Sequence, residues 1–129
     1  MRYLFMIRSC HQAMPPVEMF EAMHALAVRE VEAGRMIVDG GLAPPHMATE
    51  LKIERGKLIV RDGPFAETKE VIGGFAIFEL PDDDAARASA TEFMELHLKH
   101  MPDWDGVCEI RAIVGSQVEQ VRAFHCAPA

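Results

Sequence analysis

The sequence predicts one α+β domain, and three observations support that prediction. The chain has 129 residues, the length of a domain with a single core. Half of the residues are hydrophobic and 26% are charged, which excludes a disordered protein. Segments whose apolar residues alternate with period two are interleaved with segments of helical period, so strands and helices follow one another along the chain.

The strands are predicted from period-two alternation and from the turn residues between them. In the first strand, Tyr3, Phe5 and Ile7 share one face, and both faces are largely apolar. A tight turn at Arg55-Gly56 joins two strands into a hairpin. The predicted strands cover residues 1–7, 35–38, 50–54, 57–60, 75–80 and 107–114.

Two long helices are predicted from their capping residues and their spacing. One runs from Val17 to a stop at Gly34, and the other from the aspartates at 82–84 to about His100. The tail, residues 115–129, has the pattern of a short helix. The core stripe of the first helix is predicted as Val17, Phe20, His24, Ala27, Val28 and Val31, and that of the second as Ala86, Ala90, Phe93, His97 and Met101.

This order, βαβ, hairpin, βαβ, fits a ferredoxin-like antiparallel sheet with two helices on one face. The first and last strands carry apolar residues on both faces, so one face of the sheet is left open in a single subunit. We therefore expect a homodimer whose sheets pack face to face, with a ligand cavity near the dimer interface.

The net charge and the cysteine content limit which binding partners and which cellular compartment we expect for this protein. A net charge of −7 argues against binding nucleic acid or an anionic membrane. The apolar stretch at 3–7 is too short for a signal peptide or a membrane span. Three cysteines at wide spacing favour a reducing cytoplasm. No glycine-rich nucleotide loop is present, so no organic cofactor is expected.

One segment identifies a family. Residues 62–70 read Asp-Gly-Pro-Phe-Ala-Glu-Thr-Lys-Glu, and Ile-Gly-Gly-Phe follows at 72–75. This signature resembles that of the YCII-related proteins known as the DGPF-domain family. The resemblance covers residues 1–114 and leaves the tail outside.

The resemblance implies a dimeric α+β barrel more than it implies a reaction. Many family members are encoded near extracytoplasmic-function sigma factors, which suggests a regulatory setting. The wider superfamily includes an enzyme that removes chloride from a hydroxylated aromatic ring, and members with a proposed His-Asp pair whose histidine lies in the first helix. In this chain His24 is the histidine of that helix, with a spacing to Gly34 that differs by about one residue.

Asp62 and the charged residues that follow it are candidates for binding or catalysis. The carboxylate of Asp62 can serve as a general base or substrate anchor, or it can order its own turn by accepting backbone hydrogen bonds. Glu67, Lys69 and Glu70 form either a polar rim that fixes a ligand or a solvated loop with weak ion pairs.

Two further groups of side chains are candidates for ligand binding. Glu109 and Arg111 lie two residues apart on a strand and so share a face. There they form structural ion pairs across the dimer or anchor an anionic or hydroxylated ligand, with Arg8 contributing. His97 and His100 are close enough to share a metal, but capping of the helix end is the better interpretation, and no metal site is predicted. Trp104 either walls a pocket or plugs the helix end.

Two functions remain open on the sequence. One is an enzyme that carries out acid–base chemistry on a small aromatic or lactone-like molecule, with Asp62 and His24 as catalytic groups and Arg111 as anion anchor. The other is a non-catalytic dimer with a regulatory or interaction role, linked to sigma-factor-dependent transcription. The second needs the same cavity but no group with a tuned pKa.

Overall fold

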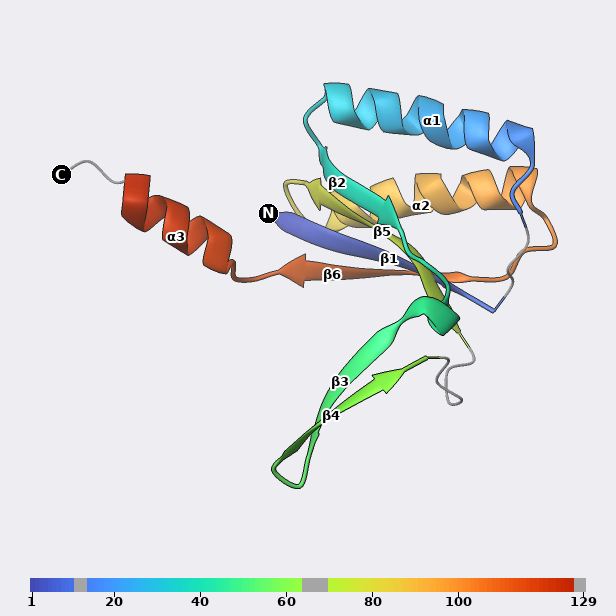
Figure 1. Ribbon diagram of the computed structural model, residues 1–129. Coiled ribbons are helices and arrows are strands. Elements are labelled where there is room, and N and C mark those ends of the chain that lie inside the picture. Colours follow the sequence, from blue (N-terminus) through green and yellow to red (C-terminus); the bar gives the residue numbers. More distant parts are fainter. Residues whose placement is uncertain (11–13, 64–69, 127–129) are drawn as a thin grey trace.

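The computed structural model describes residues 1–10, 14–63 and 70–126, and it confirms the α+β fold (Figure 1). The described residues form three helices, α1 (Val17–Glu32), α2 (Asp83–His100) and α3 (Gln117–Cys126), and a short 3-10 helix η1 (Pro45–Met47). The strands of the described residues are β1 (Arg2–Ser9), β2 (Met36–Gly41), β3 (Thr49–Glu54), β4 (Lys57–Asp62), β5 (Val71–Glu79) and β6 (Val107–Ile113).

Four of the strands form an antiparallel sheet in the order β2-β5-β1-β6. This order, with α1 and α2 together on one face of the sheet, is the ferredoxin-like arrangement that the sequence predicts (Figure 1). β3 and β4 pair only with each other and form a separate two-stranded sheet. The hairpin is therefore an insertion between the two βαβ halves.

The core lies between the sheet and the two helices. In β1, Tyr3 and Phe5 point toward the helices, as their alternation predicts, and they are 2% and 5% exposed. The ring of Phe5 stacks on that of Phe78 from β5, with ring centroids 4.7 Å apart. The core consists of Tyr3, Phe5, Phe78, Leu80, Ala86 and Ala90.

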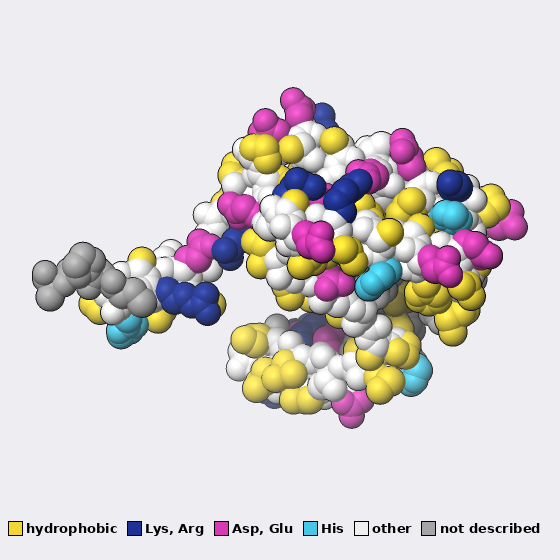
Figure 2. Space-filling model, turned by 90° about the horizontal axis from the view of Figure 1, so that it is seen from above, with side chains coloured by type: hydrophobic (Ala, Val, Ile, Leu, Met, Phe, Trp, Pro, Cys, Tyr) yellow, Lys and Arg dark blue, Asp and Glu magenta, His cyan; other side chains and the backbone are white. Residues whose placement is uncertain are grey.

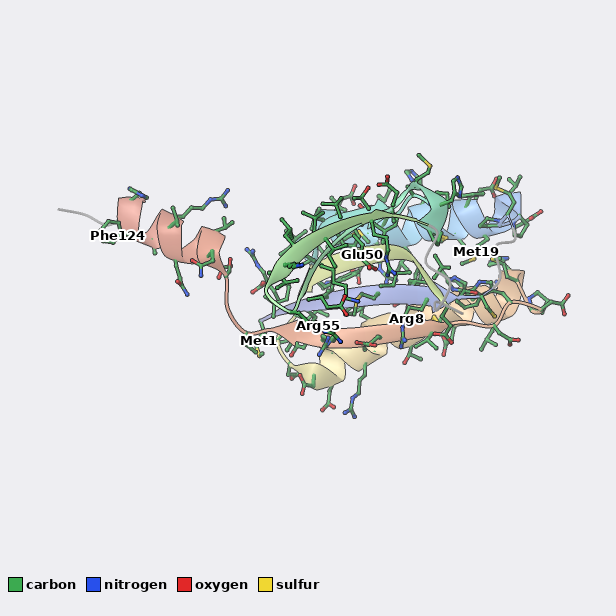
Figure 3. All side chains as sticks on the ribbon, turned by 60° about the horizontal axis from the view of Figure 1, so that its bottom comes forward. Met1, Arg8, Met19, Glu50, Arg55 and Phe124 are labelled. Atoms are coloured by element: carbon green, nitrogen blue, oxygen red, sulfur yellow. The ribbon has the colours of Figure 1, made fainter. Side chains whose placement is uncertain are left out.

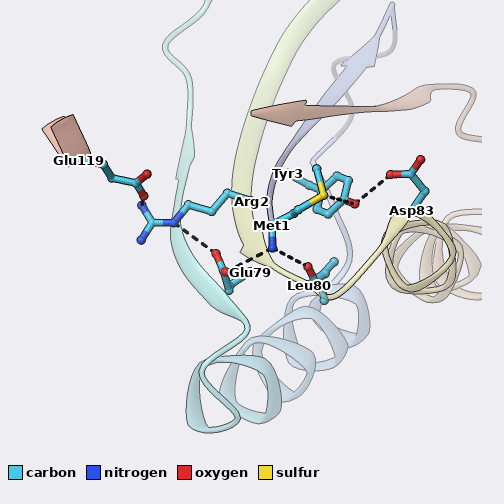
Figure 4. A network of polar contacts seen from close by, with 7 residues as sticks. All are labelled: Met1, Arg2, Tyr3, Glu79, Leu80, Asp83 and Glu119. Carbon is cyan, nitrogen blue, oxygen red and sulfur yellow. Dashed lines mark hydrogen bonds and ion pairs between the residues drawn. The ribbon is translucent and has the colours of Figure 1, made fainter. Parts of the chain in front are cut away.

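Two aspartates fix the start of α2, and one of them, Asp83, joins it to the sheet (Figure 4). Asp82 caps the helix, because its side chain accepts a hydrogen bond of 2.8 Å from the backbone N–H of Ala85. Asp83 accepts a hydrogen bond of 2.8 Å from the hydroxyl of Tyr3. Burial, together with this bond, raises the pKa of Tyr3. The predicted helix start at the aspartates is confirmed.

The predicted core face of α1 is wrong. Most side chains of the predicted stripe are exposed: Val17 is 66%, Phe20 50% and Val31 57% exposed, and His24 and Val28 are exposed as well. Ala27 is the exception, because it is half-buried and borders the space between sheet and helices. The face turned toward the sheet lies more than 100° around the helix and carries Met19, Met23, Leu26 and Glu30. α1 therefore has two apolar stripes, and only one of them meets the core.

The second strand is longer than its glycines predict. β2 continues through Gly40 and Gly41, which pair with Phe75 and Gly74 of β5. A side chain at position 40 would begin 3.0 Å from the ring of Phe75, so the glycine here makes room for an aromatic neighbour and does not end the strand.

The hairpin and α3 extend away from the body (Figure 1). The hairpin turn is confirmed at Arg55 and Gly56, whose φ angles of 51° and 75° are typical of the two-residue turn that joins twisted strands. Ser116 precedes α3 and caps its start, because its hydroxyl accepts a hydrogen bond from the backbone N–H of Glu119. Arg2 joins Glu79 of β5 to Glu119 of α3 (Figure 4). None of the helices in the described ranges combines the length and apolar composition that crossing a bilayer requires.

Candidate functional site

A cavity of about 530 Å³ lies between the sheet and the two helices. Well-packed interiors rarely contain voids much larger than a water molecule, and ligand pockets have volumes of roughly 300–1,000 Å³. The lining is mainly apolar, with contributions from β1, α1, β2, β5, α2 and the segment after α2. Methionines contribute from α1, from β2 and from the segment after α2: Met19, Met23, Met36 and Met101. Flexible, polarisable thioethers of this kind adapt to apolar molecules of varied shape.

His97 places a titratable nitrogen in this apolar lining. It is located near the C-terminal end of α2 and is 9% exposed. Nδ1 lies 3.1 Å from the carbonyl oxygen of Phe93, and because a carbonyl only accepts, Nδ1 carries the hydrogen. Burial lowers the pKa of His97 below its ordinary value, which favours the neutral ring. In that form Nε2 is a hydrogen-bond acceptor, and no residue in the described ranges donates to it.

Trp104 holds the imidazole from one side. Its ring lies on that of His97 with centroids 4.3 Å apart, while Phe93 meets the same imidazole edge-on at 4.8 Å. A side chain at Gly106 would begin 2.1 Å from the indole, so the glycine is needed for Trp104 to lie where it does. The sequence left two roles open for Trp104, and it lines the cavity.

Glu30 supplies the second buried polar group of the lining. It lies on α1 with 4% of its surface exposed. Its carboxylate accepts a hydrogen bond of 2.7 Å from Nε of Arg35 and forms an ion pair with the same guanidinium. The bond to Glu30 raises the pKa of Arg35. Since Arg35 already satisfies this carboxylate, Glu30 is better suited to hold α1 against the start of β2 than to bind a ligand.

The geometry therefore combines an apolar, ligand-sized cavity with one buried imidazole, whose Nε2 accepts no hydrogen bond from the described residues. Such a site can bind an apolar molecule that carries a hydrogen-bond donor, and the imidazole can take up a proton from it. Within residues 1–10, 14–63 and 70–126, no three His, Cys, Asp or Glu side chains converge on a position that a metal ion could occupy.

Three other predicted site residues meet on the opposite, open face of the sheet. The register pairs Met6 with Glu109 and Leu4 with Arg111, so both charged side chains share that face, as predicted. Glu109 pairs with Arg8 at 3.1 Å and with Arg111 at 3.6 Å, and Arg8 also reaches Glu70 at 3.6 Å. Arg8 is labelled on β1 in Figure 3. Nε of Arg8 is buried and has no hydrogen-bond partner among the described residues.

The two predicted catalytic residues are not brought together, and neither lines the cavity. Asp62 ends β4 on the hairpin, is exposed, and accepts a hydrogen bond of 3.2 Å from Thr49. His24 lies on the outer face of α1. Glu67 and Lys69 lie outside the described residues. The catalytic roles of Asp62 and His24 stay predictions.

Sequence reasoning missed Glu30 and the methionines of α1. A signal was present, because Met19, Met23, Leu26 and Glu30 follow helical spacing as regularly as the stripe that was chosen. Arg35, the ion-pair partner of Glu30, lies just beyond the turn at Gly34, and this turn brings its guanidinium back to α1.

Comparison with known proteins agrees with the signature at residues 62–75. The family model of the YCII-related domain matches residues 1–95, about three quarters of the chain. The chain belongs to the YCII-related domain family. An uncharacterised protein of Rhizobium meliloti (strain 1021) is 39% identical to this YCII-related chain over 64 residues. That match covers 50% of the chain and 52% of the relative, so the chain spans about half the length of the relative.

Proposed function

We propose that this YCII-related protein binds a small, largely apolar organic molecule in the cavity between sheet and helices, with Nε2 of His97 accepting a hydrogen bond from it. The observation that carries the proposal is the buried imidazole of His97 in the lining of an apolar cavity of about 530 Å³, with Nδ1 bonded to the carbonyl of Phe93. A hydroxylated aromatic ring fits this chemistry. Its ring would contact the methionines and Phe93, and its hydroxyl would donate to Nε2.

Acid–base chemistry follows from the same arrangement. Nε2 can accept a proton from a bound hydroxyl or an activated C–H group, and the charged imidazole would stack on Trp104. For this role we propose His97 in place of Asp62 and His24, since those two side chains line no part of the cavity. The regulatory alternative uses the same cavity without proton transfer.

Thymol, a hydroxylated aromatic molecule, is expected to bind the wild-type protein more tightly than its methyl ether, which lacks the donor. The variant His97→Asn keeps a donor for the Phe93 carbonyl but removes Nε2. Because one hydrogen bond contributes about 0.5–1.5 kcal/mol, the variant should weaken thymol binding by roughly 3- to 10-fold. Isothermal titration calorimetry measures both ligands on both proteins.

The methyl ether serves as the internal control, because its affinity should be nearly the same for wild type and His97→Asn. A second variant, His97→Gln, places an amide group near the position of Nε2 and should restore part of the affinity for thymol. Equal affinity of all three proteins for thymol would show that His97 does not contact the ligand.

We also propose that the protein is a homodimer that packs through the open face of the sheet. Leu4 and Met6 of β1 share that face with Phe75 and Ile77 of β5, and no helix covers it (Figure 1). Further apolar side chains on this face are 38–44% exposed: Val38, Ile72 and Val107. Exposed apolar side chains gathered in this way, beside the charged group of Arg8, Glu109 and Arg111, are typical of an association site.

A dimer is expected in sedimentation equilibrium at micromolar protein concentration. Replacing Ile77 by lysine puts a charge at the centre of the open face and should convert the dimer to monomers, because a two-fold axis brings each substitution into the interface twice. Thr91→Lys, on the outer surface of α2, is the matched control. A wild-type protein that sediments as a monomer would contradict this proposal.

A further inference from the structure

The β3–β4 hairpin has an apolar face that none of the described residues covers. The register places Leu51 opposite Val60 and Ile53 opposite Leu58, so these four side chains share one face. They are 62–79% exposed. Figure 2 shows the hairpin as a lobe apart from the body, with hydrophobic side chains on its surface. This group of four is called the arm face below.

The opposite face of the hairpin is polar and internally paired. Arg61 donates a hydrogen bond of 2.6 Å to Glu50, and Lys52 lies 3.5 Å from Glu54 (Figure 3, where Glu50 and Arg55 are labelled). This alternation is typical of a strand pair with one face in water and the other buried. A two-stranded hairpin alone is at best marginally stable in water. The arm face therefore needs a surface to pack on.

The base of the hairpin directs it away from its own subunit. The backbone N–H of Gly63 donates a hydrogen bond of 2.8 Å to the carbonyl of Ala48, and a side chain at Gly63 would begin 2.1 Å from the carbonyl oxygen of Pro45. The chain around η1 is thus tightly packed against the end of β4. From this base the hairpin extends on the side of the sheet away from the helices (Figure 1).

Charge favours a second copy of this chain as the surface that the arm meets. Residues 49–62 contain four basic side chains and three acidic ones, a net charge of +1. The whole chain has a net charge of −7, which leaves −8 for all other residues. Arg55 and Lys57 at the turn make the tip of the hairpin basic. A basic arm on an acidic body is complementary to another copy of the same molecule.

The area of the arm face is consistent with a two-fold exchange. Full burial of a Val, Leu or Ile side chain removes roughly 60–120 Å² from water, so four that are about two-thirds exposed offer roughly 200 Å². In an exchange each subunit gives one arm and receives another, which doubles this figure. A stable interface needs about 800 Å² per partner, and the open sheet face must supply the rest.

We propose that the hairpin is an exchange arm, which packs Leu51, Ile53, Leu58 and Val60 onto a second copy of this chain. This inference rests on the homodimer proposed above and assigns it a second contact surface. It accounts for an amphipathic hairpin whose apolar face no described residue covers and whose charge opposes that of the rest of the molecule.

The test compares the wild type with Ile53→Ser/Leu58→Ser by sedimentation equilibrium. The double variant is expected to raise the dimer dissociation constant by at least about 100-fold, because both substitutions occur twice in the dimer. Ile59→Ser is the matched control, since Ile59 is adjacent to Leu58 in the sequence but lies on the polar face of the hairpin. The control should dimerise like the wild type.

Hydrogen exchange of the amides in residues 49–62 is the second measurement. In the wild type their exchange should slow as protein concentration rises, and in the double variant it should stay fast. Slow exchange that is independent of concentration would overturn the proposal, because the arm would then pack on its own chain. A wild-type dimer whose dissociation constant the double variant leaves unchanged would also overturn it, although the open-face dimer would stand. A monomeric wild type would overturn both.

Discussion

Replacing Phe78 by alanine is expected to lower the free energy of unfolding by about 3–5 kcal/mol. Phe78 is 5% exposed, stacks on Phe5, and belongs to the core between the sheet and α2. It also lines the ligand cavity, so the space left by its ring would join a void that already exists. We expect the neighbouring side chains to fill little of this enlarged void, so the cost of the lost apolar contacts is not recovered by relaxation. Urea unfolding followed by circular dichroism measures the change.

The same substitution at Phe124 is the control. Phe124 lies on α3 and is 81% exposed, so Phe124→Ala should change the free energy of unfolding by no more than about 0.5 kcal/mol. A domain of this size has a total stability of roughly 5–15 kcal/mol, and the Phe78 variant should lose a large share of it. A loss below about 1 kcal/mol at Phe78 would contradict the packing of β5 against the helices.

The fold was predictable because its signals are local. Alternation in β1, the aspartate cap of α2, Gly34 after α1 and the turn at Arg55-Gly56 each depend on a few neighbouring residues. Such signals fix the order of strands and helices, and that order leaves few topologies for a sheet of this size. Gly40 misled the prediction for a related reason. Its role depends on Phe75, which lies far along the chain, so a local rule read it as the end of a strand.

The orientation of α1 was not predictable from its own residues. Both of its stripes are apolar, and the one with Val17, Phe20 and Val31 contains no acidic residue. The buried stripe contains Glu30, whose burial is acceptable only because Arg35 pairs with it. A choice between the two faces therefore requires knowledge of a contact across the helix end. The same difference in helix orientation explains why His24, predicted to lie in the core, is exposed in the structure.

The location of the cavity was beyond sequence reasoning as well. The sequence predicted a ligand space near a dimer interface on the open side of the sheet, whereas the cavity described above lies on the helix side. Whether two layers leave space between them depends on the volumes of side chains that face one another. Met19 and Met36 come from different elements, and no spacing along the chain shows that they border the same void. His97 and Trp104, seven residues apart, were within reach of the sequence and meet as ring neighbours.

Stability is expected to fall with decreasing pH in a way that depends on His97. Burial lowers the pKa of this histidine in the folded protein below its ordinary value of 6.5. As the pH falls through 6.5, the unfolded chain takes up a proton at this position before the folded chain does. Protonation then favours unfolding, with a slope of at most about 1.4 kcal/mol per pH unit for one proton. Below the folded-state pKa both states are protonated, and this contribution becomes constant.

The contribution of His97 is isolated by comparing the wild type with His97→Asn in urea unfolding at several pH values. The variant is expected to be less stable overall, because a stacked ring is lost, but its stability should change less between neutral pH and the folded-state pKa. His24→Asn is the matched control, because the ring of His24 is exposed on α1. This substitution should not change how the free energy of unfolding depends on pH. Parallel pH profiles of wild type and His97→Asn would show that the imidazole is not held neutral by burial, and the assignment of Nε2 as a hydrogen-bond acceptor in the cavity would then fail. If only His97→Asn changes the pH dependence of the unfolding free energy, the proton taken up on unfolding belongs to His97. That result would support a neutral His97 ring in the apolar cavity and its proposed hydrogen bond to the ligand.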